Sequence, residues 1–176
     1  MIETERLRLR LWTERDRAGF GTVASAPEPG GIVKMPVEID TSFAARLDDQ
    51  ARHGHCYWAA ELKATGDLVG SCGIRIADNH ADAPIHALPE IGWRIAEAHW
   101  RRGYALEAAR ASLAWGWANL DTPMIWAGTR IANEPSWRLM ERLGMTRRRE
   151  LDFRNRSYPA DHPSSATIVY AIERPA

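Results

Sequence analysis

Cysteine is scarce in this sequence, with Cys56 and Cys72 alone among 176 residues. Two cysteines that form no CxxC pair do not make the disulfide framework of a small secreted protein. Uninterrupted apolar runs are also short, well below the roughly 20 residues of a membrane helix. Met1 leads directly into the charged segment 3–10, without the apolar core of a secretory signal. These absences predict a soluble, cytoplasmic protein with no membrane partner.

An excess of charge of either sign is absent, because 23 Lys and Arg residues balance 23 Asp and Glu residues. The balance predicts no nucleic-acid partner, since polyanions are bound through a net basic surface. The six histidines show neither HExxH spacing nor a paired His/Cys pattern, so no metal site is expected. The P-loop patterns GxxxxGKS and GxxxxGKT are missing as well, which argues against a P-loop nucleotide-binding protein.

The apolar patterns predict an α/β fold in one domain over residues 1–176. Expected strands, with alternating or continuous apolar residues, cover 6–11, 56–62, 68–76, 90–95, 124–131, 145–153 and 166–172. Expected helices cover 14–23, about 41–52, 104–119 and 134–143. The order of these elements predicts a mixed central sheet of about seven strands flanked by about four helices, with the loop 77–89 bordering a cleft.

The most informative segment covers residues 90–109. Apolar residues at alternating positions predict a strand, the basic turn Arg101-Arg102-Gly103 follows, and a helix-forming run begins at once. The first N–H groups of a helix have no partner within the helix, and the helix dipole places partial positive charge there. Gly103 allows a positive φ and a close approach to a ligand, while the two arginines add charge-assisted contacts. The turn is therefore expected to bind a phosphate or pyrophosphate group.

Three segments together resemble GNAT acyltransferases: ETERLRLRLW at 3–12, EIGWRIAEAHWRRGYALEAA at 90–109 and NEPSWRLMERLGM at 133–145. They are most similar to the RimJ/RimL branch, typified by bacterial ribosomal-protein N-terminal acetyltransferases. The resemblance implies a GNAT-like fold that is split between its two central parallel strands, with acetyl-CoA as co-substrate in the split. It also implies transfer of the acetyl group to an amine acceptor.

The same resemblance assigns roles to individual residues. The residues expected to wrap the pyrophosphate are Arg101, Arg102, Gly103, Tyr104, Ala105 and Leu106. The strand residues expected to pair with the pantetheine arm, as an added strand pairs with a sheet edge, are Trp93, Arg94 and Ile95. The residues expected to contact the cofactor arm or its thiol end are Asn133 and Ser136.

Three of the matched positions carry an alternative or a departure. Asn133 is explained equally well as a helix N-cap. Trp100 stands where many members have Gln or Arg, a replacement familiar in the RimJ/RimL-like branch. Met140 stands where many members have a Tyr that protonates the leaving thiolate. Because Met140 has no proton to give, Ser136 or a water is the expected proton donor.

Acyl transfer to an amine requires a base, because amines are mostly protonated at pH 7. Glu90 is the leading candidate, since it begins the expected cofactor strand, where some GNAT enzymes place a catalytic Glu. A strand-edge carboxylate paired with an arginine explains Glu90 equally well. Glu61 is a weaker candidate, and Glu107 is expected to bond locally. Neither cysteine has a neighbouring partner that marks an activated thiolate, which favours direct attack in a ternary complex.

The combined prediction is an acetyl-CoA-dependent N-acetyltransferase that acts on a protein N-terminal amine or a small primary amine. The alternative is a GNAT-like domain that binds acyl-CoA without catalysis, as a sensor or interaction module, and Met140 favours it slightly. Turnover in the presence of an amine separates the two. Eight tryptophans are expected in the core and the cleft wall, and they leave a homodimer open as a further prediction.

Overall fold

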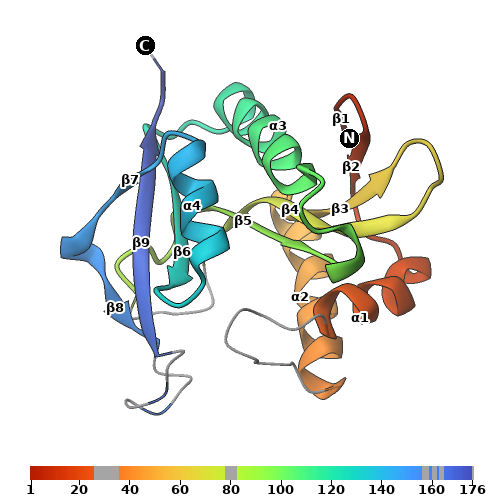
Figure 1. Ribbon diagram of the computed structural model, residues 1–176, viewed down its shortest axis with the longest axis horizontal. Coiled ribbons are helices and arrows are strands. Elements are labelled where there is room, and N and C mark those ends of the chain that lie inside the picture. The colour runs from red at the N-terminus through yellow and green to blue at the C-terminus, as the bar shows by residue number, and fades with distance from the viewer. Residues whose placement is uncertain (26–35, 78–82, 156–158, 160–161, 163–164, 176) are drawn as a thin grey trace.

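The computed structural model describes residues 1–25, 36–77, 83–155, 159, 162 and 165–175. This part of the chain forms one mixed sheet with the strand order β1-β2-β3-β4-β5-β6-β9-β7, and β8 pairs with β9 (Figure 1). The strands are β1 (Ile2–Glu3), β2 (Leu7–Arg10), β3 (Tyr57–Leu62), β4 (Leu68–Ile76), β5 (Pro89–Ile95), β6 (Met124–Arg130), β7 (Thr146–Arg147), β8 (Phe153–Arg154) and β9 (Ala166–Glu173). The helices are α1 (Arg17–Ser25), α2 (Pro36–His53), α3 (Tyr104–Asn119) and α4 (Glu134–Arg142). The predicted α/β fold, a mixed sheet flanked by four helices, is confirmed.

The two central strands, β5 and β6, run parallel and form the split that the resemblance implies. They pair at the single position Glu90–Trp126, whereas the other neighbouring strands of the described residues pair antiparallel. The directions of β5 and β6 diverge along the sheet (Figure 1). The edge of β5 that faces β6 is therefore without a strand partner over most of its length in the described chain.

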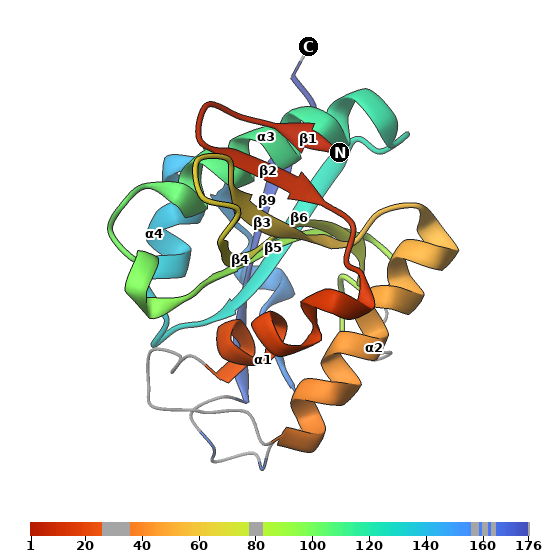
Figure 2. The same cartoon turned by 90° about the vertical axis from the view of Figure 1, so that its right-hand side faces the viewer.

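Helix α3 covers one face of the sheet, and α1 and α2 cover the other (Figure 2). The approach of α3 is close, because a Cβ atom on Gly116 would lie 2.4 Å from Cδ1 of Ile74 and 2.8 Å from Cδ1 of Ile125. On the opposite face, the rings of Trp12 and Phe20 lie 5.2 Å apart in an edge-to-face contact. These layers fix the start of α3, which follows β5, relative to the split. Within the described chain, none of the helices combines the length and apolar character that a membrane crossing requires.

Two helices begin differently from the prediction. The expected helix 14–23 starts as the 3-10 turn Glu14–Asp16 and continues as α1. Helix α2 starts at Pro36, before the expected start at about residue 41. Proline is tolerated in a first helical turn because its missing N–H would have no partner there.

The single strand expected over 145–153 is wrong. The 3-10 turn Arg149–Leu151 separates β7 from β8, and both short strands pair with β9. Asp152 explains the interruption, since its carboxylate accepts the backbone N–H of Val169 in β9 at 3.1 Å and takes the place of a strand partner. This division and the short strand β1 raise the strand count of the described residues to nine.

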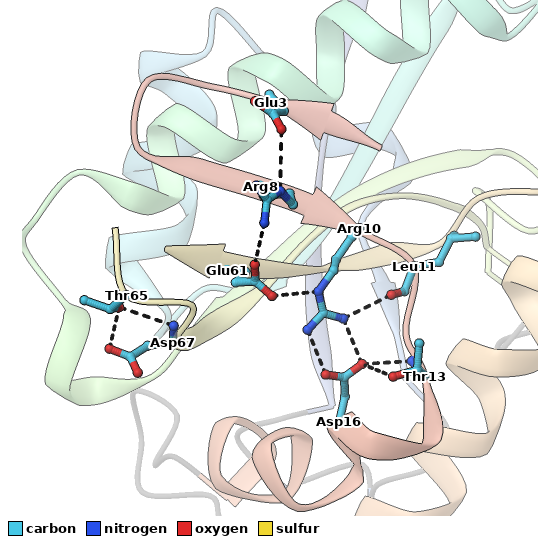
Figure 3. A network of polar contacts seen from close by, with 9 residues as sticks. All are labelled: Glu3, Arg8, Arg10, Leu11, Thr13, Asp16, Glu61, Thr65 and Asp67. Atoms are coloured by element: carbon cyan, nitrogen blue, oxygen red, sulfur yellow. Dashed lines mark hydrogen bonds and ion pairs between the residues drawn. The ribbon is translucent and has the colours of Figure 1, made fainter. Parts of the chain in front are cut away.

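A network of ion pairs joins the strands at the edge of the sheet away from the split (Figure 3). Arg8 and Arg10 of β2 bind the Glu61 carboxylate of β3 at 2.9 and 2.8 Å. Arg10 also donates two hydrogen bonds of 2.8 Å to Asp16. Burial alone would raise the pKa of Asp16, but the bonds from Arg10 and Thr13 lower it overall. Glu61 is therefore occupied at this edge and is remote from the split.

The last turn of α3 is closed by Arg174, which follows β9. Its guanidinium donates to the carbonyl oxygens of Trp117 at 2.6 Å, Leu120 at 2.5 Å and Thr122 at 3.2 Å. A helix leaves its final carbonyls without intrahelical partners, and a cation at that end also complements the helix dipole. The residue that follows β9 thus holds the end of α3 that lies away from the basic turn at residues 101–103.

Acid should destabilise this fold through His55, which is buried beneath α3. Its Nδ1 lies 2.7 Å from the carbonyl oxygen of Ile74, and its ring centroid lies 5.3 Å from that of Trp115. Burial lowers the pKa of His55, although the bond to Ile74 opposes the shift. The unfolded chain therefore takes up this proton first as the pH falls below about 6.5, which costs at most about 1.4 kcal/mol of folding free energy per pH unit.

We expect His55→Phe to flatten the fall in unfolding free energy between pH 7 and pH 5, measured by urea titration at both pH values. Equal slopes for the wild type and His55→Phe would contradict the assignment.

Candidate active site

A cavity of about 720 Å³ opens at the β5–β6 split. Its walls come from β5, the turn before α3, β6, the start of α4 and the segment that precedes β5. Ala77, Ala83 and Ile85 from that segment line it, which confirms that the predicted loop 77–89 borders a cleft within its described residues. The cavity thus brings together side chains from distant parts of the sequence.

One end of the cavity is formed by the basic turn that the sequence predicts to bind phosphate. Gly103 lies at the N-cap of α3 with φ 82° and ψ 0°, in the left-handed region, and Arg101 also has a positive φ of 59°. Because α3 starts directly after Gly103, its first N–H groups point out of the helix toward the cavity end. His99, on the same wall, has a buried Nδ1 with no hydrogen-bond partner among the described residues. The geometry suits an anion.

Five of the six predicted turn residues line the cavity, namely Arg101, Gly103, Tyr104, Ala105 and Leu106. Arg102 does not line it; its carbonyl oxygen accepts a hydrogen bond of 2.9 Å from Nη1 of Arg6. The turn is also tied to the end of β5, because the indole N–H of Trp100 donates to the carbonyl of Ile95 at 2.7 Å.

The strand residues Trp93, Arg94 and Ile95 line the cavity as predicted. Their backbones pair on one side with β4, where Arg94 faces Ser71. On the side of β6 they have no strand partner within the described chain. The Arg94 side chain is held by α1, since its Nε donates to the carbonyl oxygen of Val23 at 3.0 Å. An extended ligand with amide groups therefore finds an open strand edge here.

Asn133, Ser136 and Met140 line the cavity at the start of α4. Asn133 occupies the N-cap position, but its side chain makes no capping hydrogen bond. Its backbone carbonyl accepts the N–H of Ser136 at 3.1 Å. The interpretation of Asn133 as a side-chain cap is therefore wrong. Met140 is 3% exposed, so the position of the usual family Tyr carries a buried thioether.

The end of the cavity away from the phosphate turn holds a cluster of Glu90, Arg75 and Tyr57. Oε2 of Glu90 accepts a hydrogen bond of 2.9 Å from Nη2 of Arg75 and one of 3.0 Å from the Tyr57 hydroxyl. The absence of a side chain on Gly92 makes this possible, because a Cβ there would lie 2.6 Å from the Tyr57 ring. The guanidinium of Arg46 packs 4.6 Å from the centroid of the same ring. Glu90 is thus both a lining carboxylate and the partner of an arginine.

Burial and charge set the protonation of the groups around Glu90. Burial and the neighbouring carboxylate raise the pKa of Tyr57, which keeps the phenol neutral and able to donate. Burial opposes the charge on Arg75, but Tyr57 and Glu90 outweigh it and raise the pKa of Arg75. The cluster therefore holds one fixed cation and one hydrogen-bond donor against the Glu90 carboxylate.

Tyr57 and Arg75 belong to this site without having been predicted from the sequence. The available signal is the facing register of two predicted strands, since Arg75 in β4 lies directly opposite Glu90 in β5. An opposite-charge pair at facing positions stabilises an antiparallel pair. The apolar patterns predict the two strands but not their register, so they do not show that Arg75 lies opposite Glu90.

The other candidate groups lie outside the cavity or are inert. Glu61 binds Arg8 and Arg10. Glu107 forms a structural bond, as predicted, but its partner Arg6 is 101 positions away in the sequence. Both cysteines are buried, and burial raises each thiol pKa to about 12, so neither supplies a thiolate nucleophile. Among the described residues, no group of three or more His, Cys, Asp and Glu is arranged to hold a metal ion.

The chain matches known proteins over most of its length. The model of the acetyltransferase (GNAT) domain matches residues 6–146. The chain is 30% identical over 183 aligned residues to YoaA of Bacillus subtilis, named as an uncharacterized N-acetyltransferase, covering 99% of this chain and 97% of that protein. The structure of an acetyltransferase from Agrobacterium tumefaciens superimposes with a TM-score of 0.75 and 27% identity, over 98% of this chain and 93% of that one.

A similar fold occurs in Mycobacterium smegmatis RimJ, solved in complex with CoA-disulfide. It superimposes with a TM-score of 0.68 and 21% identity, over 97% of this chain and 86% of that chain. The family model covers most of the chain, and the fold with its split sheet matches that of the solved Agrobacterium acetyltransferase. The chain therefore belongs to the GNAT acetyltransferase family, whose members use acetyl-CoA as co-substrate.

Proposed function

We propose that this protein is an acetyl-CoA-dependent N-acetyltransferase of the RimJ/RimL-like kind. Its acceptor is a primary amine, either a protein N-terminus or a small molecule. One observation carries the proposal: a single cavity joins the phosphate turn, the open edge of β5 and the Glu90 cluster. The cytoplasmic location belongs to the same proposal, because two free buried cysteines suit a reducing compartment.

Binding of acetyl-CoA follows from the order of these features along the cavity. The N–H groups after Gly103 receive the pyrophosphate, and the guanidinium of Arg101 adds charge. The open backbone of residues 93–95 pairs with the amides of the pantetheine arm. Asn133 and Ser136 then contact the arm near its thiol end, with the Asn133 amide available because it does not cap α4.

The chemistry is direct attack of the neutral amine on the thioester carbonyl. Glu90 accepts the proton of the amine, while Arg75 and Tyr57 hold its carboxylate in place. A backbone N–H of the open β5 edge stabilises the developing oxyanion. As the C–S bond breaks, Ser136 passes a proton to the leaving thiolate and regains one from solvent, while Glu90 releases the amine proton to solvent. A covalent acyl-enzyme is not part of the proposal, because both thiols are buried and remain protonated.

A second candidate is a domain that binds acyl-CoA without transferring the acyl group. The observation in its favour is the buried Met140 in place of the usual Tyr. The bond between Glu90 and Arg75 also favours it, since a carboxylate that pairs with a neighbouring arginine is explained by a structural role alone. Both candidates require CoA binding, so only turnover separates them.

The test of the proposal is thermal unfolding with acetyl-CoA, CoA and ATP, followed by thiol release with amines and peptides. A ligand at a hundred times its Kd adds about 2.7 kcal/mol of stability, a shift of several degrees. We expect acetyl-CoA and CoA to stabilise the protein and ATP to have no effect, with amine-dependent thiol release. Stabilisation without release for any amine would support the second candidate, and no stabilisation at millimolar acetyl-CoA would contradict both.

Ser136→Ala should lower kcat about tenfold or more, because positioned proton transfer typically contributes about a hundredfold or more and a water replaces only part of it. The KM for acetyl-CoA should change little, since only the hydroxyl is lost. Steady-state kinetics with a fixed amine measure both quantities, and Ser136→Thr, which keeps a hydroxyl, is the matched control. An unchanged kcat in Ser136→Ala would assign the proton to a water.

A further inference from the structure

The turn between β1 and β2 binds the first turn of α3, about a hundred residues further along the chain. Oε1 of Glu107 accepts hydrogen bonds from the Thr4 hydroxyl at 2.5 Å and from the backbone N–H of Arg6 at 2.8 Å. Oε2 of Glu107 accepts from Nε of Arg6 and lies 2.7 Å from its Nη2. Burial would raise the pKa of Glu107, but these bonds lower it overall. The carboxylate is therefore charged and fully engaged.

The same arginine reaches the backbone of the phosphate turn. Nη1 of Arg6 donates to the carbonyl oxygen of Arg102 at 2.9 Å, and its guanidinium lies 4.7 Å from the centroid of the Tyr104 ring. A Cβ atom on Gly103 would lie 3.4 Å from Nη2 of Arg6. Arg6 thus contacts Arg102 and Tyr104, on either side of Gly103, while it is bound to Glu107.

This contact coincides with the part of the turn where the backbone is least favourable. Arg101 has a φ of 59°, which costs an ordinary residue about 1–3 kcal/mol and persists only where the surroundings impose it. The carbonyl that Arg6 holds belongs to Arg102, between Arg101 and the left-handed Gly103. A fixed turn presents its N–H groups to an anion without an ordering cost at the moment of binding.

We infer that Arg6 and Glu107 are positioning residues that hold the phosphate turn in its binding conformation before the ligand arrives. The inference rests on the proposed function for the identity of the ligand, a CoA pyrophosphate. Neither side chain lines the cavity, so both act through the turn backbone. The pair stabilises a conformation and makes no contact with the acetyl group or the amine.

The experiment compares two acetyl donors in Arg6→Gln, Glu107→Gln and the double variant. Acetyl-CoA carries the pyrophosphate, whereas S-acetylpantetheine lacks it. Because the Arg6 side chain is 43% exposed and solvent weakens such pairs, we expect each single variant to raise the KM for acetyl-CoA about three- to tenfold. The KM for S-acetylpantetheine and both kcat values should stay within about twofold. The double variant should cost less than the product of the single effects, because both changes break one unit.

Glu61→Gln is the matched control. The side chains of Glu61 and Glu107 are similarly buried, at 14% and 16% exposed, and each binds arginines of the N-terminal segment. Glu61→Gln removes an ion pair between β2 and β3 that does not contact the turn, so the KM for acetyl-CoA should be unchanged. Arg6→Lys keeps a charge but cannot bind Glu107, the Arg102 carbonyl and the Tyr104 ring at once. Its KM for acetyl-CoA should fall between those of the wild type and Arg6→Gln, and it replaces Arg6→Gln if that variant does not fold.

A second readout needs no ligand. In Arg6→Gln and Arg6→Lys, amide hydrogen exchange at residues 107–110, where the N–H of Glu107 bonds to the carbonyl of Gly103, should be faster than in the wild type. Unchanged exchange, or an equal loss of affinity for both donors, would overturn the inference. If the wild type binds no CoA, the proposed function fails, and the exchange rates still decide whether Arg6 fixes the turn.

Discussion

Replacement of Gly103 by valine should lower CoA affinity by roughly a hundredfold or more, about 2.8 kcal/mol, while the protein stays folded. Gly103 has a φ of 82°, a conformation that strains a β-branched residue, so the valine side chain would shift the turn toward negative φ. The N–H groups that follow would then lose their common direction. Gly103 is exposed, so the fold has room for the added methyl groups. Calorimetric titration with CoA measures the loss.

Gly66→Val is the control for strain alone. Gly66 has a φ of 78° in the turn between β3 and β4, and a Cβ there would have no neighbour within 4 Å. Both variants should lose a similar amount of stability, about 1–3 kcal/mol, but Gly66→Val should bind CoA like the wild type. Full CoA affinity in a folded Gly103→Val variant would remove the assignment of this turn to the pyrophosphate.

Glu90→Gln should lower kcat/KM by about a hundredfold or more at pH 7, the range in which a general base contributes. The loss should be smaller at pH 9, because a larger fraction of an α-amino acceptor, with a pKa near 7.7–8.0, is already neutral there. A pH–rate profile with a peptide acceptor measures both values. The same proportional loss at the two pH values would count against Glu90 as the base.

The substitution also removes the partner of a buried arginine. Arg75 and Glu90 have side chains that are 10% and 13% exposed, and breaking such a pair costs about 3–5 kcal/mol when one charge is left alone. Arg75→Gln provides the matched variant, since it breaks the same pair but keeps the carboxylate. We expect similar stability losses in both variants, with a large pH-dependent loss of rate in Glu90→Gln and a smaller one in Arg75→Gln, which keeps the base and loses one of the groups that hold it. Matching rate profiles in the two variants would show that the pair is structural.

Local sequence signals located the features that consist of neighbouring residues. The strand Glu90–Ile95, the turn through Gly103 and helix α3 are contiguous, so apolar alternation, a glycine and a helix-forming run were enough to predict them. The two ends of α4 were equally predictable, because Pro135 lies in its first turn and Gly144, with a positive φ, follows its last turn. The strand, the turn and the helix were therefore predictable as local structure, and five of the six turn residues line the cavity.

The opposite end depended on information that local patterns do not contain. Glu90 acquires its surroundings from the register of β4 against β5, which places Arg75 opposite it, and from Gly92, which admits the Tyr57 ring. The prediction of one continuous strand after α4 was wrong for a related reason, because the carboxylate of Asp152 replaces a backbone partner of β9. In each case a side chain from another element decides the structure.

Helix α3 is fastened at its two ends by residues from opposite ends of the sequence. Thr4 and Glu107 are 103 positions apart, and Trp117 and Arg174 are 57 positions apart. Contacts of such long separation form late, because the entropy of closing a long loop must be overcome before the contact stabilises anything. During synthesis, the last turn of α3 stays unfastened until position 174 has left the ribosome. Helix α3 therefore belongs to the part of the molecule that is completed last, although the sequence signal for it is among the strongest in the chain.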